Sequence, residues 1–331
     1  MVRRNGLTLV VTLVFVLVSS MAIMAPWKAG AAAKQTVEAA FVDKAPNALD
    51  DPAWEKAKAV EVPNEGKEKF KGKKINVATK VVYTKDSIHF LLRWKDATKS
   101  VTKGAWQYDG KGWNHLKGDE DRIALVFEID RINNFATKGC TVLCHGPVGA
   151  PAKEFKLATA NKAEKGDLWH WKAARSAPYN SADDTWLTAA GEKTGRKNDA
   201  GGGGDAENQT EDKSKPLYMQ DPAKKASVPG FLLFEEAIRI TDYSIFRAGD
   251  IITYRMPKKP SGSRGDIMAM SRYSESEKTW TVMLSRKLNT GNEDDAVFTP
   301  KQRYTFGMAL FDDSGDEHSF DSEALSLEFG K

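Results

Sequence analysis

The sequence predicts an all-β protein, an antiparallel β-sandwich with long loops and a few short helices. Short runs rich in β-branched and aromatic residues alternate with turn residues, and no long amphipathic helical pattern is present. Residues 75–83 and 87–94 form a hairpin pattern joined by the turn TKD. Residues 121–130, DRIALVFEID, are apolar on both faces near their centre, so we expect an internal strand.

Later segments extend the same pattern. Four of them have the composition of strands, and they are DIITYRM, TWTVMLSRKL, YTFGMALF and ALSLEF. The segment DPAWEKAKAV predicts a turn or two of helix before the first sheet strand. From about residue 185 to 229 the composition changes to Gly, Lys, Asp, Asn and Ser. This predicts a long polar loop, which is either a solvated insertion or a functional loop.

The N-terminus predicts export. A short basic segment, MVRRN, precedes an apolar run and then small residues at A-x-A spacing. This order is typical of a secretory signal peptide, which we expect to cover residues 1–33, with cleavage after Ala33 or, alternatively, Ala31. An uncleaved membrane anchor is the competing interpretation. We therefore expect residues 34–331 to form a single periplasmic domain with no membrane span after cleavage.

The charge of the chain excludes one class of partner. The full sequence has 49 basic and 45 acidic residues, but Arg3, Arg4 and Lys28 belong to the predicted signal peptide. The remaining chain is therefore nearly neutral. Nucleic-acid binding requires a concentrated basic face, so we expect no nucleic-acid partner.

The segment GCTVLCHG holds the two cysteines of the chain, Cys140 and Cys144, with His145 directly after them. Covalent haem attachment uses two thiols and an adjacent imidazole, usually spaced C-x-x-C-H. Here one extra residue separates the cysteines, although residues four apart still share one face of a helical turn. Haem is the favoured interpretation. A local disulfide, a zinc site and a catalytic thiol are the alternatives.

A second aromatic and basic segment follows. His170 lies between Trp169 and Trp171, and Lys172 and Arg175 come shortly after it. The rings could pack on a macrocycle and the two cations could contact its propionates. The alternative is an ordinary packed aromatic segment with a satisfied histidine.

Several blocks together resemble a known family. INVATKVVYTKDSIHFLLRWKDAT, GDEDRIALVFEID, GCTVLCHG, GDLWHWKAARS and SRKLNTGNEDDAVF are similar to the ethylbenzene-dehydrogenase-related haem-binding domain, from about Phe41 to Phe329. This family includes gamma subunits of periplasmic molybdenum enzymes of the dimethylsulfoxide reductase class. The resemblance implies a β-sandwich with haem held at one end between loops.

The resemblance also implies a ligand set. The gamma subunits bind b-type haem through Met and Lys, whereas this chain offers Cys140, Cys144 and His145 in the corresponding loop. We therefore expect c-type haem, with thioethers from the two cysteines and His145 on the iron. The second family ligand lies shortly before the last strand, which points to His318, with His170 as the alternative. A b-type haem beside a Cys140–Cys144 disulfide is the other arrangement.

Such a protein is expected to be no enzyme. It would be an electron-transfer protein between a periplasmic donor and acceptor, with a molybdoenzyme complex or a small cytochrome as partner. A rival prediction comes from AFVDKAPNALDDPAWEKAKAVEV, which resembles the opening of family 9 carbohydrate-binding modules. A sugar-binding sandwich without haem needs no C-x3-C-H motif. A haem sensor or haem enzyme with one open axial position is a further rival.

Overall fold

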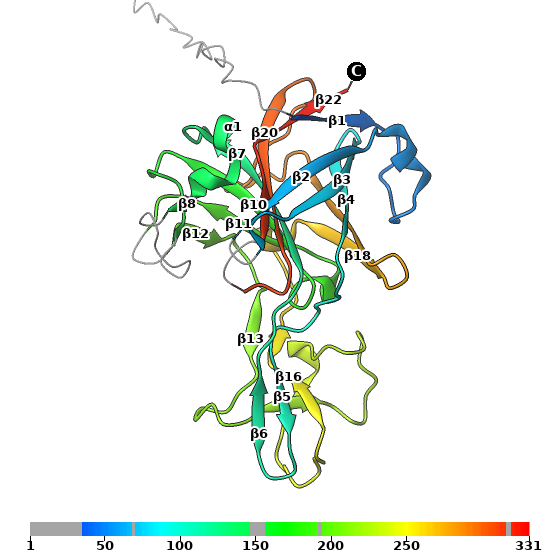
Figure 1. The fold of residues 1–331 in the computed structure, drawn as a ribbon, viewed down its shortest axis with the longest axis vertical. Helices are drawn as coiled ribbons and strands as arrows, with labels where there is room; N and C mark the ends of the chain where they lie inside the picture. The colour runs from blue at the N-terminus through cyan, green and yellow to red at the C-terminus, as the bar shows by residue number, and fades with distance from the viewer. Residues whose placement is uncertain (1–34, 68–69, 146–155, 191–193, 316–318, 331) are drawn as a thin grey trace, which may run out of the picture. The chain divides into compact units, whose positions relative to one another are not determined.

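Most strands in the described part of the chain join one large sheet that bends into two facing halves (Figure 1). The computed structural model describes residues 35–67, 70–145, 156–190, 194–315 and 319–330, with backbone alone at residues 144, 145 and 156. The order along the sheet is β12-β11-β10-β7-β20-β21-β2-β3-β4-β19-β18, while β1 pairs with β22 and β3, and β22 also pairs with β20. The strands of this sheet are β1 (Gln35–Phe41), β2 (Val60–Gly66), β3 (Lys74–Tyr83), β4 (Ser87–Lys95), β7 (Arg122–Asp130), β10 (Lys165–Lys172), β11 (Asp183–Leu187), β12 (Arg196–Asn198), β18 (Met268–Ser274), β19 (Thr279–Lys287), β20 (Arg303–Phe311), β21 (Phe320–Ser322) and β22 (Leu325–Phe329).

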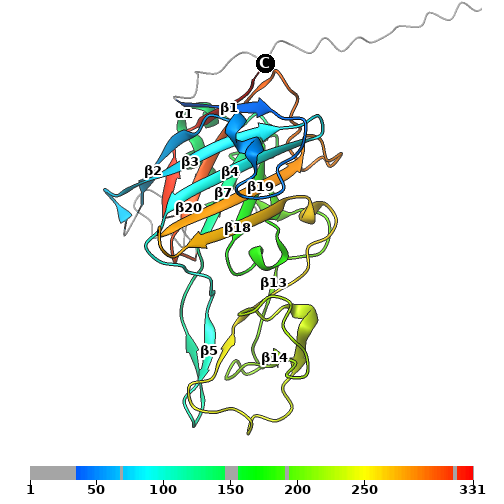
Figure 2. The same cartoon turned by 90° about the vertical axis from the view of Figure 1, so that its right-hand side faces the viewer.

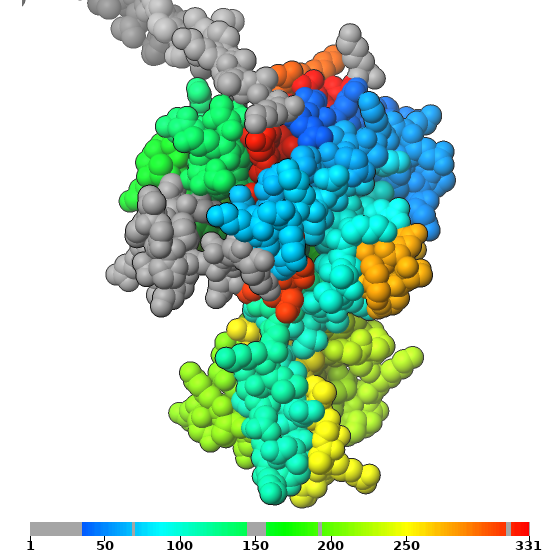
Figure 3. Space-filling view, in the orientation of Figure 1, coloured from blue at the N-terminus to red at the C-terminus, as the bar shows by residue number. Residues whose placement is uncertain are grey.

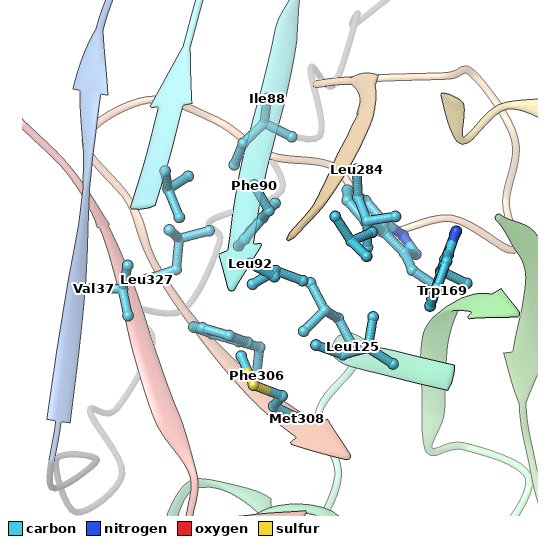
Figure 4. Close-up of a cluster of buried hydrophobic side chains, with 14 of the residues drawn as sticks. Val37, Ile88, Phe90, Leu92, Leu125, Trp169, Leu284, Phe306, Met308 and Leu327 are labelled. Atoms are coloured by element: carbon cyan, nitrogen blue, oxygen red, sulfur yellow. The ribbon is translucent and has the colours of Figure 1, made fainter. Parts of the chain in front are cut away.

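The core lies between the two halves of the sheet. Figure 2 shows β2, β3, β4, β19 and β18 side by side in one half. The apolar side chains of this half meet those of β7, β10 and β20, as Figure 4 shows for Phe90, Leu284, Leu125, Trp169 and Phe306. These side chains are fully buried. The predicted all-β sandwich is therefore confirmed, with the parallel pairs of β1 as an exception to its antiparallel pattern.

The strands with the strongest sequence signals form as predicted. β3 and β4 pair as the expected antiparallel hairpin, with Val81 opposite Phe90. β7 is internal, between β10 and β20. Its successive side chains point to opposite faces, so Leu125 enters the core while Val126 faces the other side of the sheet. Both faces of β7 are covered, which explains its continuous apolar run.

The outer face of β7 is covered by the segment that holds the first cysteine. The short helix α1 (Phe135–Lys138) and the 3-10 turn Gly139–Leu143 place Phe135, Cys140 and Leu143 in a second apolar cluster with Val126. β8 (Cys144–His145) then pairs with β9 (Lys156–Leu157). The 3-10 turn therefore holds Cys140 and packs it into the protein interior, whereas Cys144 begins β8.

Gly307 makes room for that packing. A Cβ added to this β20 residue would lie 2.3 Å from the Sγ of Cys140. We expect Gly307→Ala to lower the free energy of unfolding by about 1–3 kcal/mol because the core would be overpacked. Urea unfolding measures this change. The matched control is Gly112→Ala, whose added Cβ meets nothing within 4 Å. Adding Cys140→Ala to the Gly307 variant should recover part of the loss, and equal stability of both glycine variants would contradict the account.

A second group of short strands is separate from the large sheet (Figures 1 and 2). The teal β5–β6 hairpin covers much of the visible face of this group in the space-filling view of Figure 3. The group contains three small sheets, namely β16-β5-β6, β13-β17 and β14-β15. Their bounds are β5 (Ala105–Tyr108), β6 (Trp113–Leu116), β13 (Asp205–Glu207), β14 (Tyr218–Gln220), β15 (Ala237–Arg239), β16 (Ile251–Thr253) and β17 (Arg255–Pro257). We call this group the extension.

The polar segment 185–229 contributes to both regions. Its first residues complete β11 and form β12, and the later ones form β13 and β14 of the extension. The segment is thus more ordered than the predicted loop, because its short strands pair with partners far away in the sequence, such as β13 with β17.

The helices of the described ranges are short. The segment DPAWEKAKAV forms the predicted turn of helix as a 3-10 turn, Pro52–Lys56, in which the Asp51 side chain accepts a hydrogen bond from the Ala53 backbone at 2.9 Å. Three further 3-10 turns cover Ala177–Tyr179, Phe234–Glu236 and Ser263–Gly265. None of the helices in the described ranges has the length and hydropathy of a membrane span.

Candidate ligand-binding pocket

A charged pocket lies where the sandwich meets the extension. β10 and β11 supply its sandwich side, because alternate residues of β10 face opposite ways: Trp169 and Trp171 enter the core, whereas Lys172 faces the pocket. The segments before β13 and after β17 supply the other side. The pocket is lined by Lys172, Arg175, Ser176, Ser181, Ala182, Asp183, Gly204, Asp205, Lys258, Pro260 and Arg264.

Asp183 is the central anion of the pocket. Its carboxylate accepts hydrogen bonds from Lys172 Nζ, from Arg264 Nε at 2.8 Å and from an Arg196 guanidinium nitrogen at 3.3 Å. Burial would raise the pKa of Asp183, but these three cations outweigh that effect and hold the pKa well below its usual value. Asp183 therefore stays ionised and fixes the cations around it.

The pKa of Lys172 is lowered as well, but here burial is the dominant cause. Burial lowers the pKa of Lys172 to about 7, although Asp183 opposes the shift. One carboxylate shared among three cations cannot neutralise all of them, and Arg196 and Arg175 also repel the ammonium group. An additional anion in the pocket would relieve this excess of positive charge.

The extension closes the other side of the pocket. Arg175 donates to Glu120 and lies 3.5 Å from Asp205, which also accepts a hydrogen bond from Arg255 at 2.9 Å. Gly204, the last residue of the glycine run, has a φ of +76°, and an added Cβ would come 3.0 Å from the Arg264 guanidinium. The glycine thus permits a close approach of the backbone to this cation.

Lys258 is the pocket cation with the fewest polar partners. Its Nζ lies 4.7 Å from the centroid of the Phe234 ring. Among the described residues, no carboxylate lies within ion-pair distance of it. The lining as a whole has four cationic side chains and two carboxylates, together with the hydroxyls of Ser176 and Ser181. The space between these side chains is small, about 20 Å³, so the lining suits one anionic group of a ligand whose hydroxyl groups lie at the pocket mouth.

The predicted site residues are brought together only in part. Lys172 and Arg175 share the pocket, as expected for two cations that bind an anionic group. His170 lies on the same face of β10 but is buried, with its ring stacked on Phe311 at 5.2 Å. Neither ring nitrogen has a hydrogen-bond partner in the described part of the chain. Burial, followed by the charge of Lys172, lowers the pKa of His170 well below its usual value, so the ring is neutral at pH 7.

Of the predicted haem site, the structure describes the surroundings of Cys140, Lys172 and Arg175. The Sγ of Cys140 points into β20, 4.0 Å from the carbonyl oxygen of Met308, and the residue is 7% exposed. Lys172 and Arg175 are already paired with Asp183, Glu120 and Asp205. The side chains of Cys144 and His145, and the whole of His318, lie outside the described residues. Their roles as haem ligands, and haem as the cofactor, stay sequence-based predictions.

Sequence reasoning missed most of the pocket. Asp183, Asp205, Lys258 and Arg264 come from four different segments, and strand pairing alone brings them together. One local signal was available: the run of four glycines at 201–204 stands directly before Asp205, in a segment that the sequence marked as a functional loop or a solvated insertion.

Comparison with solved structures corrects the predicted function. The chain is similar to a protein of Bacteroides uniformis ATCC 8492 described as carbohydrate-binding, with 7% identity, a TM-score of 0.37, and 89% of this chain and 99% of the other covered. It is also similar to a family 9 carbohydrate-binding module from Caldicellulosiruptor kristjanssonii in complex with cellotriose, with 6% identity, a TM-score of 0.37, and 90% and 95% covered. The prediction of a haem-binding electron-transfer protein is wrong by this comparison, which finds the class of the rival prediction.

Comparison of sequences identifies the family. Among curated proteins, no sequence matches this chain. The family model described as ethylbenzene dehydrogenase matches residues 51–322, which include the large sheet from β2 to β21 and the whole extension. The resemblance found in the sequence blocks is confirmed, and the chain belongs to the ethylbenzene dehydrogenase family.

Proposed function

We propose that the chain is a non-catalytic carbohydrate-binding β-sandwich module whose ligand is a sugar that bears a carboxylate. The single observation behind this proposal is the pocket between β10, β11 and the extension, with four cations and two carboxylates in its lining. Arginine and lysine bind carboxylates through charge-assisted hydrogen bonds. Carboxylates and serine hydroxyls bind sugar hydroxyls as acceptors and donors. Binding requires no chemical step.

A pair of matched sugars tests this function. Isothermal titration calorimetry of the purified protein with D-glucuronate and with D-glucose separates the carboxylate from the rest of the ring. We expect glucuronate to bind at least about tenfold more tightly, which corresponds to about 1.4 kcal/mol. Equal binding of the two sugars would remove the role of the cations. Absence of binding to both would contradict the proposed ligand class.

Lys258 should contribute to ligand binding without supporting the fold. Replacing it with methionine is expected to weaken glucuronate binding about tenfold, because one charge-assisted hydrogen bond is lost, and to leave the free energy of unfolding unchanged within about 0.5 kcal/mol. The neighbouring exposed Lys259 lies outside the pocket lining and supplies the control Lys259→Met. Calorimetry of both variants measures the effect. The same loss in both variants would show that general positive charge, and not Lys258, attracts the sugar.

Family membership supports a proposal about the setting of this module. We infer that it is exported through its N-terminal segment and associates with a molybdoenzyme complex of the ethylbenzene dehydrogenase type. The support is the family match over residues 51–322 together with the signal-peptide pattern. Affinity purification of the tagged chain from its native periplasm, followed by molybdenum analysis of the eluate, tests the association. The intact mass of the secreted chain tests cleavage after Ala33.

A further inference from the structure

Five carboxylates converge at one edge of the sandwich, on the opposite face of β11 from the sugar pocket. Asp183 faces the pocket, so the next residue, Asp184, faces inward. Oxygen atoms of Asp167, Asp184 and Asp295 lie within 4.8 Å of one another, and so do oxygen atoms of Asp199, Asp294 and Asp295. The two groups share Asp295.

Strand pairing and one loop bring these residues together. On β10 and β11, Trp169 pairs with Asp184, and on β11 and β12, Thr185 pairs with Asn198. Asp199 follows directly in the same register, so it lies beside Asp184 on the inner face. The loop between β19 and β20 supplies Asp294 and Asp295. Asp167 and Asp184 belong to β10 and β11, Asp199 directly follows β12, and the last two belong to a loop, so the cluster is not a product of one acidic run.

The buried charges of this edge do not balance. Asp167, Asp184, Asp199 and Asp295 are at most 3% exposed. Arg286, itself fully buried, is the one cation in the described ranges that forms ion pairs with them, at 2.6 Å to Asp167, 3.0 Å to Asp295 and 3.7 Å to Asp184. Four buried carboxylates around one guanidinium leave a large excess of negative charge, which requires protons or a further cation.

Asp199 marks where that cation is needed. It is 3% exposed, both carboxylate oxygens are inaccessible, and neither has a hydrogen-bond partner or an ion pair in the described part of the chain. Asp295, by contrast, accepts from Arg286, from Thr290 at 2.5 Å and from Asn292 at 3.3 Å. A buried carboxylate with two unused oxygens beside two other carboxylates has the donor set of a metal ligand.

A second carboxylate group in the protein lacks this feature. Asp96, Asp121 and Asp312 also place oxygen atoms within 4.8 Å of one another. However, Asp121 accepts hydrogen bonds from the Ser100 backbone at 2.7 Å and from the Trp280 indole at 2.9 Å, and Asp96 accepts from the Thr98 backbone at 3.0 Å. The protein itself satisfies that group.

We propose that Asp199, Asp294 and Asp295 bind a calcium ion at the edge formed by β10, β11 and β12. All donors are carboxylate oxygens, which suit a hard cation and exclude a site of the Cys and His type that zinc prefers. Arg286 forms ion pairs with Asp167, Asp184 and Asp295 but not with Asp199, so the uncompensated charge lies on the side of Asp199 and Asp294. The half-buried Asp294 gives the ion and its waters access from solvent.

Calcium titration of the metal-free protein tests the proposal. The full chain is treated with EDTA, exchanged into chelator-free buffer, and titrated with CaCl2 by calorimetry and by thermal unfolding. We expect one ion per chain and a rise in Tm of about 5 °C at a free Ca²⁺ concentration about 100 times Kd. No heat and no change in Tm at millimolar Ca²⁺ would overturn the proposal. In that case a protonated Asp199 would account for the charge, since burial, followed by Asp294 and Asp295, raises its pKa to about 8.

Two variants locate the ion. Asp199→Asn and Asp294→Asn keep the size of the side chain, and each is expected to weaken Ca²⁺ binding at least tenfold; the half-buried Asp294 provides the test if Asp199→Asn does not fold. Asp96→Asn, in the second carboxylate group, should keep the full response. An unchanged response in Asp294→Asn, or a lost response in Asp96→Asn, would place the ion elsewhere and overturn the assignment. Glucuronate binding is measured separately, so failure of the calcium site leaves the proposed function untouched.

Discussion

Replacing Arg286 with methionine is expected to lower the free energy of unfolding by about 3–5 kcal/mol, because removal of one partner leaves buried charges without compensation. Arg286 is fully buried, donates to Asp167 at 2.6 Å and to Asp295 at 3.0 Å, and lies over the Trp169 ring at 4.6 Å. Methionine keeps much of the packing but removes the positive charge. Urea unfolding in EDTA at pH 7 measures the loss.

An exposed ion pair supplies the control for this result. Arg93 pairs with Glu277 at the surface, where half of each side chain is accessible. We expect Arg93→Met to change the free energy of unfolding by less than about 1 kcal/mol. A similarly small effect of Arg286→Met would mean that the four carboxylates are protonated in the native protein and do not depend on the guanidinium.

His89 should make the stability depend on pH in the acidic range. Its ring is buried in β4 between two hydroxyls, with 2.8 Å to Ser87 Oγ and 2.8 Å to Ser285 Oγ, and burial lowers the pKa of His89 to about 4. The unfolded chain has the usual pKa of about 6.5. Between these two values the unfolded state binds more protons, so the free energy of unfolding rises with pH. Its contribution is complete above pH 6.5 and is lost as the pH falls through 4.

The variant His89→Gln isolates this contribution. The difference in the free energy of unfolding between the two proteins is expected to change by about 3 kcal/mol between pH 7 and pH 4, with the histidine protein losing more. Urea unfolding at half-unit pH steps measures both curves, and the offset at pH 7 gives the cost of the substitution itself. Parallel curves would show that the buried ring takes up a proton without penalty.

The sequence predicted strands where one physical signal dominates. β3, β4 and β7 have runs of β-branched and aromatic residues, and their burial requires those residues in any sandwich. β10 was interpreted as an aromatic segment and not as a strand. Successive side chains of β10 point to opposite faces, so Trp169 and Trp171 lie in the core and His170 and Lys172 lie on the other face. The charged residues of that second face made the core strand difficult to identify from the sequence.

The site was harder to predict for a different reason. The spacing of Cys140, Cys144 and His145 is a local pattern that can be read directly in the sequence. In the structure, however, Cys140 packs against β20 in the interior. Lys172 and Arg175, predicted as propionate contacts, both line the pocket. Their partners, Arg264 and Lys258, follow them by about ninety residues and arrive through the extension, which no local pattern specifies. Asp199 lies in a polar segment, and the sequence of that segment does not distinguish a buried aspartate from an exposed one.

The most direct test of the proposed function is a crystal structure of the protein grown with D-glucuronate. We expect the carboxylate of the sugar in the pocket between β10, β11 and the extension, within hydrogen-bond distance of Lys258 or Arg264, with the sugar hydroxyls near Asp183, Asp205 and Ser181. Glucuronate bound elsewhere, with this pocket still filled by its own ion pairs, would contradict the proposed carbohydrate site.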